Sequence, residues 1–287
     1  MLQLQTTLPA VDWDRPWLAP FRQTAQSVLA EKHWRTAVNA IARRRQLINH
    51  LDLPIHFVDQ SELPAGVAYE TFISRTGQVP TRDNLHDFFN ALAWLTYPVA
   101  KSGLNAIQAA EIARLSELAA LQPIRAGAGE VLPIPAPIQN SRSERGVVRD
   151  RATLFDENAA VLVASQPAVE VALRAHEWLH ALLTLRPAFG RCCEVRLFGH
   201  ALIEKLVNPY KAITAHVWVL SVEPAFFDLN EDDKRTHLDA LLGSAVNEGL
   251  LGVPAMGLPV LGVPGWWHDQ DAMFYEDKAV FRPKRSL

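Results

Sequence analysis

The stretch TRDNLHDFFNALAWLTYP, residues 81–98, constrains the fold more than any other part of this sequence. Read at about 100° per residue, it predicts one amphipathic helix with two unlike faces. One face is apolar and must pack on a core, and the other face is polar. We expect Thr81 to cap the helix and Tyr97-Pro98 to end it, because proline disfavours helix in the residue before it. The polar face carries Asp83, His86, Asp87, Asn90 and Trp94.

Size and composition bound the class of protein. The 287 residues are enough to bury a substantial core, and 49% hydrophobic with 21% charged residues indicates an ordinary globular protein. The net charge of -3 gives no general attraction to nucleic acid or anionic lipid. No run of about 18 apolar residues and no basic-then-apolar leader occur, so we expect no membrane span, no signal peptide and a cytoplasmic location. Cys192 and Cys193 are adjacent and poorly placed to bond each other.

Apolar periodicity predicts further helices, over residues 21–48, 103–121, 167–185, 196–207 and 231–248. Asn230 suits the N-cap of the last, and Lys101-Ser102-Gly103 suits a break between the helices at 81–98 and 103–121. Residues 213–222 fit either a strand or a buried helix.

Extended structure is predicted in three short pieces. IHFV and YETFIS, between residues 54 and 80, are rich in β-branched and aromatic residues. ATLFDENAAVLVA predicts a β-hairpin with Asp156-Glu157-Asn158 at its tip. The last 40 residues predict an ordered but irregular aromatic tail. The fold class that follows is α+β, mainly helical, with one or two small antiparallel β-hairpins packed on helices.

Residues 122–147 form the clearest interruption, with four prolines, three of them within five residues. Such a segment is typical of a long functional loop or of a boundary between lobes. We predict one domain over residues 1–287, with two lobes at 1–121 and 148–287 as the alternative.

HEWLH, residues 176–180, matches the zinc-peptidase pattern His-Glu-x-x-His. On a helix, His176 and His180 would lie one turn apart and share a metal ion, with Glu177 as the general base. A third ligand would come from FGHALIEKL, which offers His200 or Glu204. The competing interpretation is an ordinary helix face.

A dispersed set of imidazoles and carboxylates offers a different site. His86 and Asp87 lie on the helix at 81–98, and His200 and Glu204 lie on a later helix. Such mixtures bind Zn, Mn or Fe, and they equally transfer protons without metal. We predict metal binding by His86, His200 and Glu204, and catalysis by these three with Asp87. The alternative is a solvated polar face and an ordinary turn. Further polar candidates are Asp83, Asp156, Glu157 and His216.

Scattered cations offer a way to bind an anionic small-molecule substrate. If several converge, they would hold a phosphate or carboxylate; otherwise they are surface charge. No Walker loop, Gly-x-Gly-x-x-Gly turn or Gly-x-Ser-x-Gly elbow occurs, so nucleotide-loop and serine-hydrolase functions are not indicated. The cationic residues are Arg82, Lys101, Arg149, Lys205, Lys211, Arg282 and Arg285; the predicted substrate contacts are Arg82, Asn90, Lys205, Tyr210 and Lys211.

Several long segments resemble a bacterial family, the domain-of-unknown-function family 3025. They are TRDNLHDFFNALAWLTYP, TLFDENAAVL, FGHALIEKLVNPYKAITAHVWVL, LGVPGWW and VFRPKR, and the resemblance runs from about residue 60 to the C-terminus. It implies no settled activity. It implies that the following residues match positions of the family's motifs: Arg82, Asp83, His86, Asp87, Asn90, Trp94, Asp156, Glu157, His200, Glu204, Lys205, Tyr210, Lys211 and His216. Near HEWLH it implies His176, an acidic residue and Trp178 without a fixed second histidine, which favours the dispersed set.

Three functional hypotheses follow, and the sequence leaves open whether the protein is an enzyme. The first is a metal-assisted hydrolase acting on a small anionic or phosphorylated substrate. The second is a non-catalytic structural or interaction protein, in which the polar motifs form buried networks that fix helix packing. The third is a zinc peptidase acting through HEWLH.

Overall fold

The computed structural model describes residues 8, 10–121, 146–248, 252 and 254–284. Its helices and strands follow the chain in this order: α1 (Ala19–Leu29), α2 (Trp34–Arg44), β1 (His56–Asp59), α3 (Tyr69–Thr76), β2 (Gln78–Thr81), α4 (Leu85–Thr96), α5 (Pro98–Leu121), α6 (Val147–Asn158), β3 (Ala159–Ala164), α7 (Ala168–Arg174), a π-helix (His180–Thr184), β4 (Cys193–Leu197), α8 (His200–Lys205), β5 (Thr214–Ser221), α9 (Glu231–Asn247), β6 (Met256–Pro259) and α10 (Ala272–Glu276). The mainly helical α+β class predicted above is confirmed.

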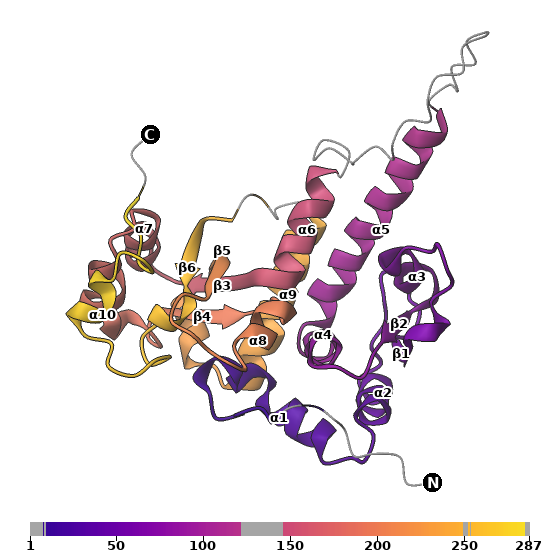
Figure 1. Cartoon of the computed structure of the whole chain (residues 1–287), viewed down its shortest axis with the longest axis horizontal. Helices are drawn as coiled ribbons and strands as arrows, with labels where there is room; N and C mark the ends of the chain where they lie inside the picture. The colour runs from indigo at the N-terminus through magenta and orange to yellow at the C-terminus, as the bar shows by residue number, and fades with distance from the viewer. Residues whose placement is uncertain (1–7, 9, 122–145, 249–251, 253, 285–287) are drawn as a thin grey trace.

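The long helix α5 runs through the middle of the molecule (Figure 1). On one side it packs against α3, which belongs with α2 and the two-stranded β1–β2 sheet. On the other side it packs against α6 and α9, beyond which lies a four-stranded sheet. The larger sheet has the strand order β4-β3-β5-β6, and every residue of the central strand β3 is buried.

The predicted antiparallel pairing holds only for part of these sheets. β3 pairs antiparallel with β4, and β5 pairs antiparallel with β6. β1–β2 and β3–β5 are instead parallel: α3 connects β1 to β2, and the chain between β3 and β5 runs through α7, the antiparallel strand β4 and α8. Residues 213–222, which fitted two interpretations, form the strand β5.

The polar-faced helix predicted at 81–98 is α4; it ends before Tyr97-Pro98 as predicted, but its start differs from the prediction. Asn84 is the N-cap, and its side chain accepts a hydrogen bond from the Asp87 N–H at 2.7 Å. Thr81 is wrong as the cap, because it ends β2 and its hydroxyl donates to the Val79 carbonyl. Pro98 starts α5 rather than merely stopping α4, since proline fits the first turn of a helix, where no N–H bond is lost. The predicted break at 101–103 is therefore wrong.

The N-terminus of α5 is capped from another helix. The Val99 and Ala100 N–H groups donate to the two carboxylate oxygens of Asp239 in α9, at 3.0 and 2.9 Å. These are two of the N–H groups that have no partner within their own helix. Asp239 is buried, so this cap ties α9 to α5 in the core.

Replacing Asp239 by asparagine is expected to remove part of the pH dependence of stability. Burial raises the pKa of Asp239 to about 6, although the two N–H groups lower it. A carboxyl group whose pKa is higher in the folded state stabilises the protein fully below its unfolded pKa, and that contribution is lost as pH rises to about 6. The difference between the pKa of Asp239 in the folded state and in the unfolded state corresponds to about 3 kcal/mol of unfolding free energy. Urea unfolding from pH 4 to 7 should therefore give a flatter profile for Asp239→Asn; an unchanged slope would contradict this.

Other predicted boundaries are also corrected. The helix predicted at 21–48 is two helices, α1 and α2. YETFIS is not a strand but most of α3, which ends at Gly77 in the left-handed conformation that glycine favours. The predicted hairpin over 152–164 is the second half of α6 followed directly by β3. The predicted helix at 196–207 is shorter, because β4 occupies its start.

The described residues of the C-terminal segment, 252 and 254–284, contain β6 and α10 as regular elements and are otherwise irregular. Residues 122–145, which hold most of the predicted interruption, lie outside the described residues. One buried apolar cluster includes side chains from both sides of that segment, such as Phe89 and Phe155. The division into one domain or two lobes stays a prediction.

In the described residues, no helix is both long and apolar enough to cross a membrane.

Candidate functional site

Four residues from three helices meet at one place, and we call them the His–Glu cluster: His86, Glu157, His200 and Glu204. His86 lies in the first turn of α4, and Glu157 is the penultimate residue of α6. His200 begins α8, and Glu204 follows one turn later on the same helix. The cluster thus depends on how α4, α6 and α8 pack.

Gly199 allows α8 to begin against the end of α6. A Cβ atom at this position would lie 2.5 Å from the backbone nitrogens of Asn158 and Ala159. The Phe198 and Gly199 N–H groups both donate to the Ala159 carbonyl at 3.0 Å. This close backbone contact between the end of α6 and the start of α8 brings His200 to Glu157.

The donor atoms of three cluster residues converge. The Nε2 atoms of His86 and His200 lie 3.2 Å apart, and Glu157 Oε2 lies 3.5 Å from His200 Nε2. One ligand atom from each of these residues lies within 4.8 Å of the others. Two histidines and a carboxylate are a common ligand set for zinc and other divalent transition metals.

Glu204 orients the first of these histidines. Its Oε2 lies 3.1 Å from His86 Nδ1, so this carboxylate accepts the Nδ1–H hydrogen bond and leaves the Nε2 lone pair free. A carboxylate on the outer nitrogen of a metal-binding histidine also makes the imidazole a better ligand. Glu204 therefore fits a supporting position more closely than the metal-ligand position predicted from the sequence.

Burial sets the charge state of His200. Burial lowers its pKa to about 4, even though the nearby Asp156 carboxylate raises it. His200 is therefore neutral at pH 7, the form that can bind a metal. Its buried Nδ1 lies 3.9 Å from Asp156 Oδ1, and no side chain among the described residues comes within hydrogen-bonding distance of it. Burial and the charge of Asp156 also raise the pKa of Glu157.

A buried polar network adjoins the cluster. Lys101 Nζ in α5 donates to Asp156 Oδ1 at 2.5 Å and to Asn90 Oδ1 at 2.8 Å. Asn90 in turn donates to the Tyr69 hydroxyl at 3.1 Å. Burial is the largest single influence and raises the pKa of Asp156, but the charge and hydrogen bond of Lys101, together with His200 and His86, hold it below the usual value. This network joins α3, α4, α5 and α6.

Asp87, predicted as catalytic, is engaged with Arg82. It accepts hydrogen bonds from the Arg82 backbone N–H and from Arg82 Nε and Nη2, at 2.6, 3.0 and 3.0 Å. The hydrogen bond to Asp87 raises the pKa of Arg82. Both residues thus fix the start of α4.

The remaining predicted residues lie in other contacts. Asp83 pairs with Arg35 at 3.2 Å, and Lys211 pairs with Asp277 at 2.8 Å and lies 4.4 Å from the Phe274 ring centre. Lys205 and Tyr210 are exposed. His216 is half-buried in β5, opposite Ala159 of β3. The predicted convergence of cations around the histidines is not seen for Lys211.

The helix that the zinc-peptidase hypothesis requires is not formed. α7 ends at Arg174, and His176 lies in a turn with φ of 60°. The π-helix begins only at His180, so the two histidines do not share a helix face. His176 Nδ1 lies 3.0 Å from the Arg282 carbonyl, to which the Trp178 indole also donates at 2.8 Å. The motif thus fastens the C-terminal segment.

Comparison with known proteins identifies the family. A family model described as "Protein of unknown function (DUF3025)" matches residues 55–128 and 135–285. The chain belongs to this family. No curated protein and no solved structure matches it. The resemblance predicted from the sequence is confirmed, and every residue of the His–Glu cluster lies within the matched DUF3025 region.

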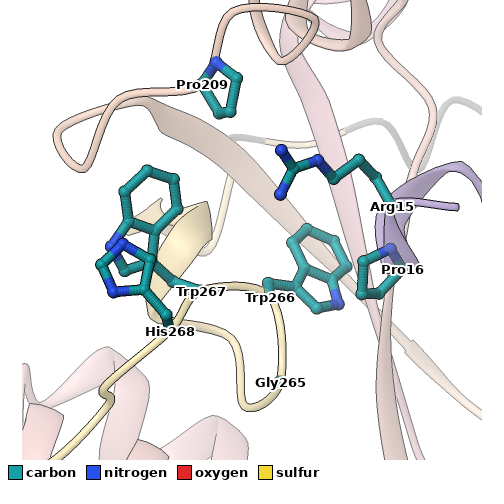
Figure 2. A pocket seen from close by; sticks show the side chains of 7 residues that line it. All are labelled: Arg15, Pro16, Pro209, Gly265, Trp266, Trp267 and His268. Carbon is teal, nitrogen blue, oxygen red and sulfur yellow. The ribbon is translucent and has the colours of Figure 1, made fainter. Parts of the chain in front are cut away.

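A hollow of about 550 Å³ lies elsewhere in this DUF3025 chain, and none of its lining residues belongs to the His–Glu cluster. Figure 2 shows it between Arg15 on one side and the Trp267 and His268 rings on the other. Those two rings stack with centres 4.9 Å apart. Trp266 beside them packs on Trp17.

Sequence reasoning missed several polar residues near the DUF3025 cluster. Glu157 was a general polar candidate because it was placed in a turn, and Lys101 was grouped with surface cations. Tyr69, Glu70 and Asn105 were not singled out. The available signal is a Lys and an Asn at 101 and 105, four residues apart and therefore on one face of a helix whose first turns are mainly apolar.

Proposed function

We propose that this DUF3025 protein is a metal-dependent hydrolase in which His86, His200 and Glu157 bind one divalent ion. The separation of the donor atoms carries the proposal. Metal–ligand bonds of about 2.0–2.1 Å in a tetrahedral zinc site place two donor atoms about 3.3 Å apart. The two separations here, 3.2 and 3.5 Å, are close to that value.

The surroundings of the donors support the same proposal. His200 is buried and neutral, whereas the side chains of His86 and Glu157 are 33% and 40% exposed. The cluster therefore has a closed inner side and an open outer side. An open position suits a catalytic site, where a bound ion lowers the pKa of water and supplies a nucleophile at neutral pH. Two imidazoles and a carboxylate suit Zn, Mn or Fe.

The proposed substrate is small and carries an anionic group such as a phosphate. A divalent ion with one carboxylate ligand keeps a net positive charge that attracts an anion. The exposed Lys205 follows Glu204 on α8 and could add to this attraction. Arg82 is already paired with Asp87, and Lys211 with Asp277, so neither supports substrate binding here.

Metal analysis of purified, untagged protein tests the proposal. We expect about one zinc, manganese or iron ion per wild-type chain, and a loss of affinity of more than about 100-fold in His200→Ala and Glu157→Gln, because each removes a ligand. The double variant His176→Ala/His180→Ala is the control and should keep its metal. Metal lost only in that control would instead support the peptidase, and no metal in any preparation would exclude the proposed site.

Activity is tested on the same proteins. The wild type should hydrolyse p-nitrophenyl phosphate, a chelator should stop the reaction, and the added metal should restore it. His200→Ala should stay folded by circular dichroism but be inactive.

A non-catalytic role is the second candidate, and the polar network favours it for some residues. Arg82, Asp87 and Asn90 satisfy one another or other buried groups, as expected of residues that fix helix packing. If this role extends to His86 and His200, their alanine variants will mainly lower the melting temperature, and their metal affinity will be no lower than that of the wild type.

A further inference from the structure

A small cavity lies between α3, α4, α5 and α6. Its volume is about 10 Å³, close to the minimum that holds one water molecule. Polar side chains line much of it, among them Glu70, Lys101, Asn105 and Asp156. Empty cavities in proteins are usually lined by apolar groups alone, whereas a cavity of this size that presents several hydrogen-bonding groups is suited to one buried water molecule.

Two polar groups that line the cavity have unused hydrogen-bonding capacity. Asn105 is 1% exposed; its Nδ2 donates to the Glu70 carbonyl and to Glu70 Oε2, but its Oδ1 accepts no hydrogen bond. The ammonium of Lys101 has three N–H donors, of which two bind Asp156 and Asn90. Among the described residues the third has no acceptor. Buried groups of this kind nearly always have a partner.

We propose that this cavity binds one ordered water molecule that joins Asn105 to Lys101. The water donates to Asn105 Oδ1 and accepts from Lys101 Nζ. Its second hydrogen points to a carboxylate, either Asp156 or ionised Glu70. A metal cation or ammonium ion does not suit the cavity, since the Lys101 charge repels it.

Glu70 lies close to the surroundings of the His–Glu cluster, because Glu70 and Asp156 line the same cavity. Glu70 faces Lys101 on α5, and Asp156 and Arg149 on α6, and it follows Tyr69 on its own helix. Burial raises its pKa to about 7, and Asp156 raises it further, whereas Asn105, Lys101 and Arg149 lower it. Glu70 therefore changes charge near neutral pH, and Asp156 lies between it and His200.

The effect of Glu70 on metal affinity rests on the proposed metal site. When Glu70 ionises, it adds a negative charge near Asp156, so a cation at the cluster should bind more tightly. Zinc affinity should rise between pH 6 and 8 by about three- to tenfold more in the wild type than in Glu70→Gln, which keeps a neutral side chain of the same size. Glu70 thus acts as a positioning residue that never touches the metal.

The water itself is tested without metal, by a high-resolution crystal structure of the wild-type chain. Electron density for one water within hydrogen-bonding distance of Asn105 Oδ1 and Lys101 Nζ is expected. An empty cavity would overturn the proposal, and it would do so even if Glu70→Gln failed to fold.

The coupling is tested by zinc calorimetry from pH 6 to 8. Asp239→Asn is the matched control, because Asp239 is another buried carboxyl group with a raised pKa but does not line the cavity. Asp239→Asn should keep the wild-type dependence of zinc affinity on pH, whereas Glu70→Gln should lose the steep rise between pH 6 and 8. Identical profiles for all three proteins would refute the coupling alone. A wild type that binds no zinc would refute the metal site and the coupling but not the water.

Discussion

Replacing Lys101 by methionine is expected to lower the free energy of unfolding by about 3–5 kcal/mol. Lys101 and Asp156 form a buried pair whose side chains are 4% and 12% exposed. Methionine keeps the length of the side chain but leaves the Asp156 carboxylate without its counter-charge and Asn90 Oδ1 without its donor. Removing one partner of a buried pair costs far more than the pair contributes, because the remaining charge is desolvated and unpaired. Urea unfolding at pH 7 measures the loss.

Lys211→Met is the matched control. Its pair with Asp277 is 28% and 36% exposed, so solvent replaces the lost contact and the expected cost is about 1 kcal/mol or less. The double variant Lys101→Met/Asp156→Asn should recover part of the stability, because it removes the unpaired charge. Equal losses for Lys101→Met and Lys211→Met would show that the buried pair is not important for stability.

Gly199→Ala is expected to cost about 3 kcal/mol and to separate His200 from Glu157. The added methyl group would lie 2.5 Å from two backbone nitrogens and 2.6 Å from the Glu157 carbonyl carbon. Backbone atoms at a helix end cannot move aside as a flexible side chain can. The start of α8 must therefore shift away from α6. Thermal unfolding should show a melting temperature lower by about 6–12 °C, and zinc affinity should fall.

Gly257→Ala in β6 provides the comparison. There a Cβ atom meets only ordinary contacts, the nearest being Thr214 Cγ2 at 3.5 Å. Its expected effect is within about 0.5 kcal/mol, as for substitutions away from special sites. If Gly199→Ala behaves like Gly257→Ala, then the close approach of α6 and α8 does not position the cluster.

Local signals in the sequence were sufficient where they were strong. The helix predicted at 231–248 is α9, because Asn230 caps it and three acidic residues occupy its first turn. The apolar face of 81–98 is buried in α4, since a period of 3.6 residues directly determines which side chains share a face. The same signals failed for YETFIS and for 152–158. In these short segments β-branched or turn-like residues are compatible with helix, and tertiary packing overrides weak propensity.

The sequence by itself determined the family, the α+β class and the residue types that form the candidate site. His86, His200, Glu157 and Glu204 are all polar candidates in the sequence because of their imidazole and carboxylate side chains, whereas their spacing does not show that they meet. Only the tertiary structure decided that they meet, which of them converge, and that His176 and His180 do not. Spacing along a helix is set by the backbone within a few residues. Contacts such as His86–His200 join positions 114 residues apart and depend on how whole helices pack. That packing depends on backbone contacts such as the one between Gly199 and Asn158, and no local pattern in the sequence predicts such a contact.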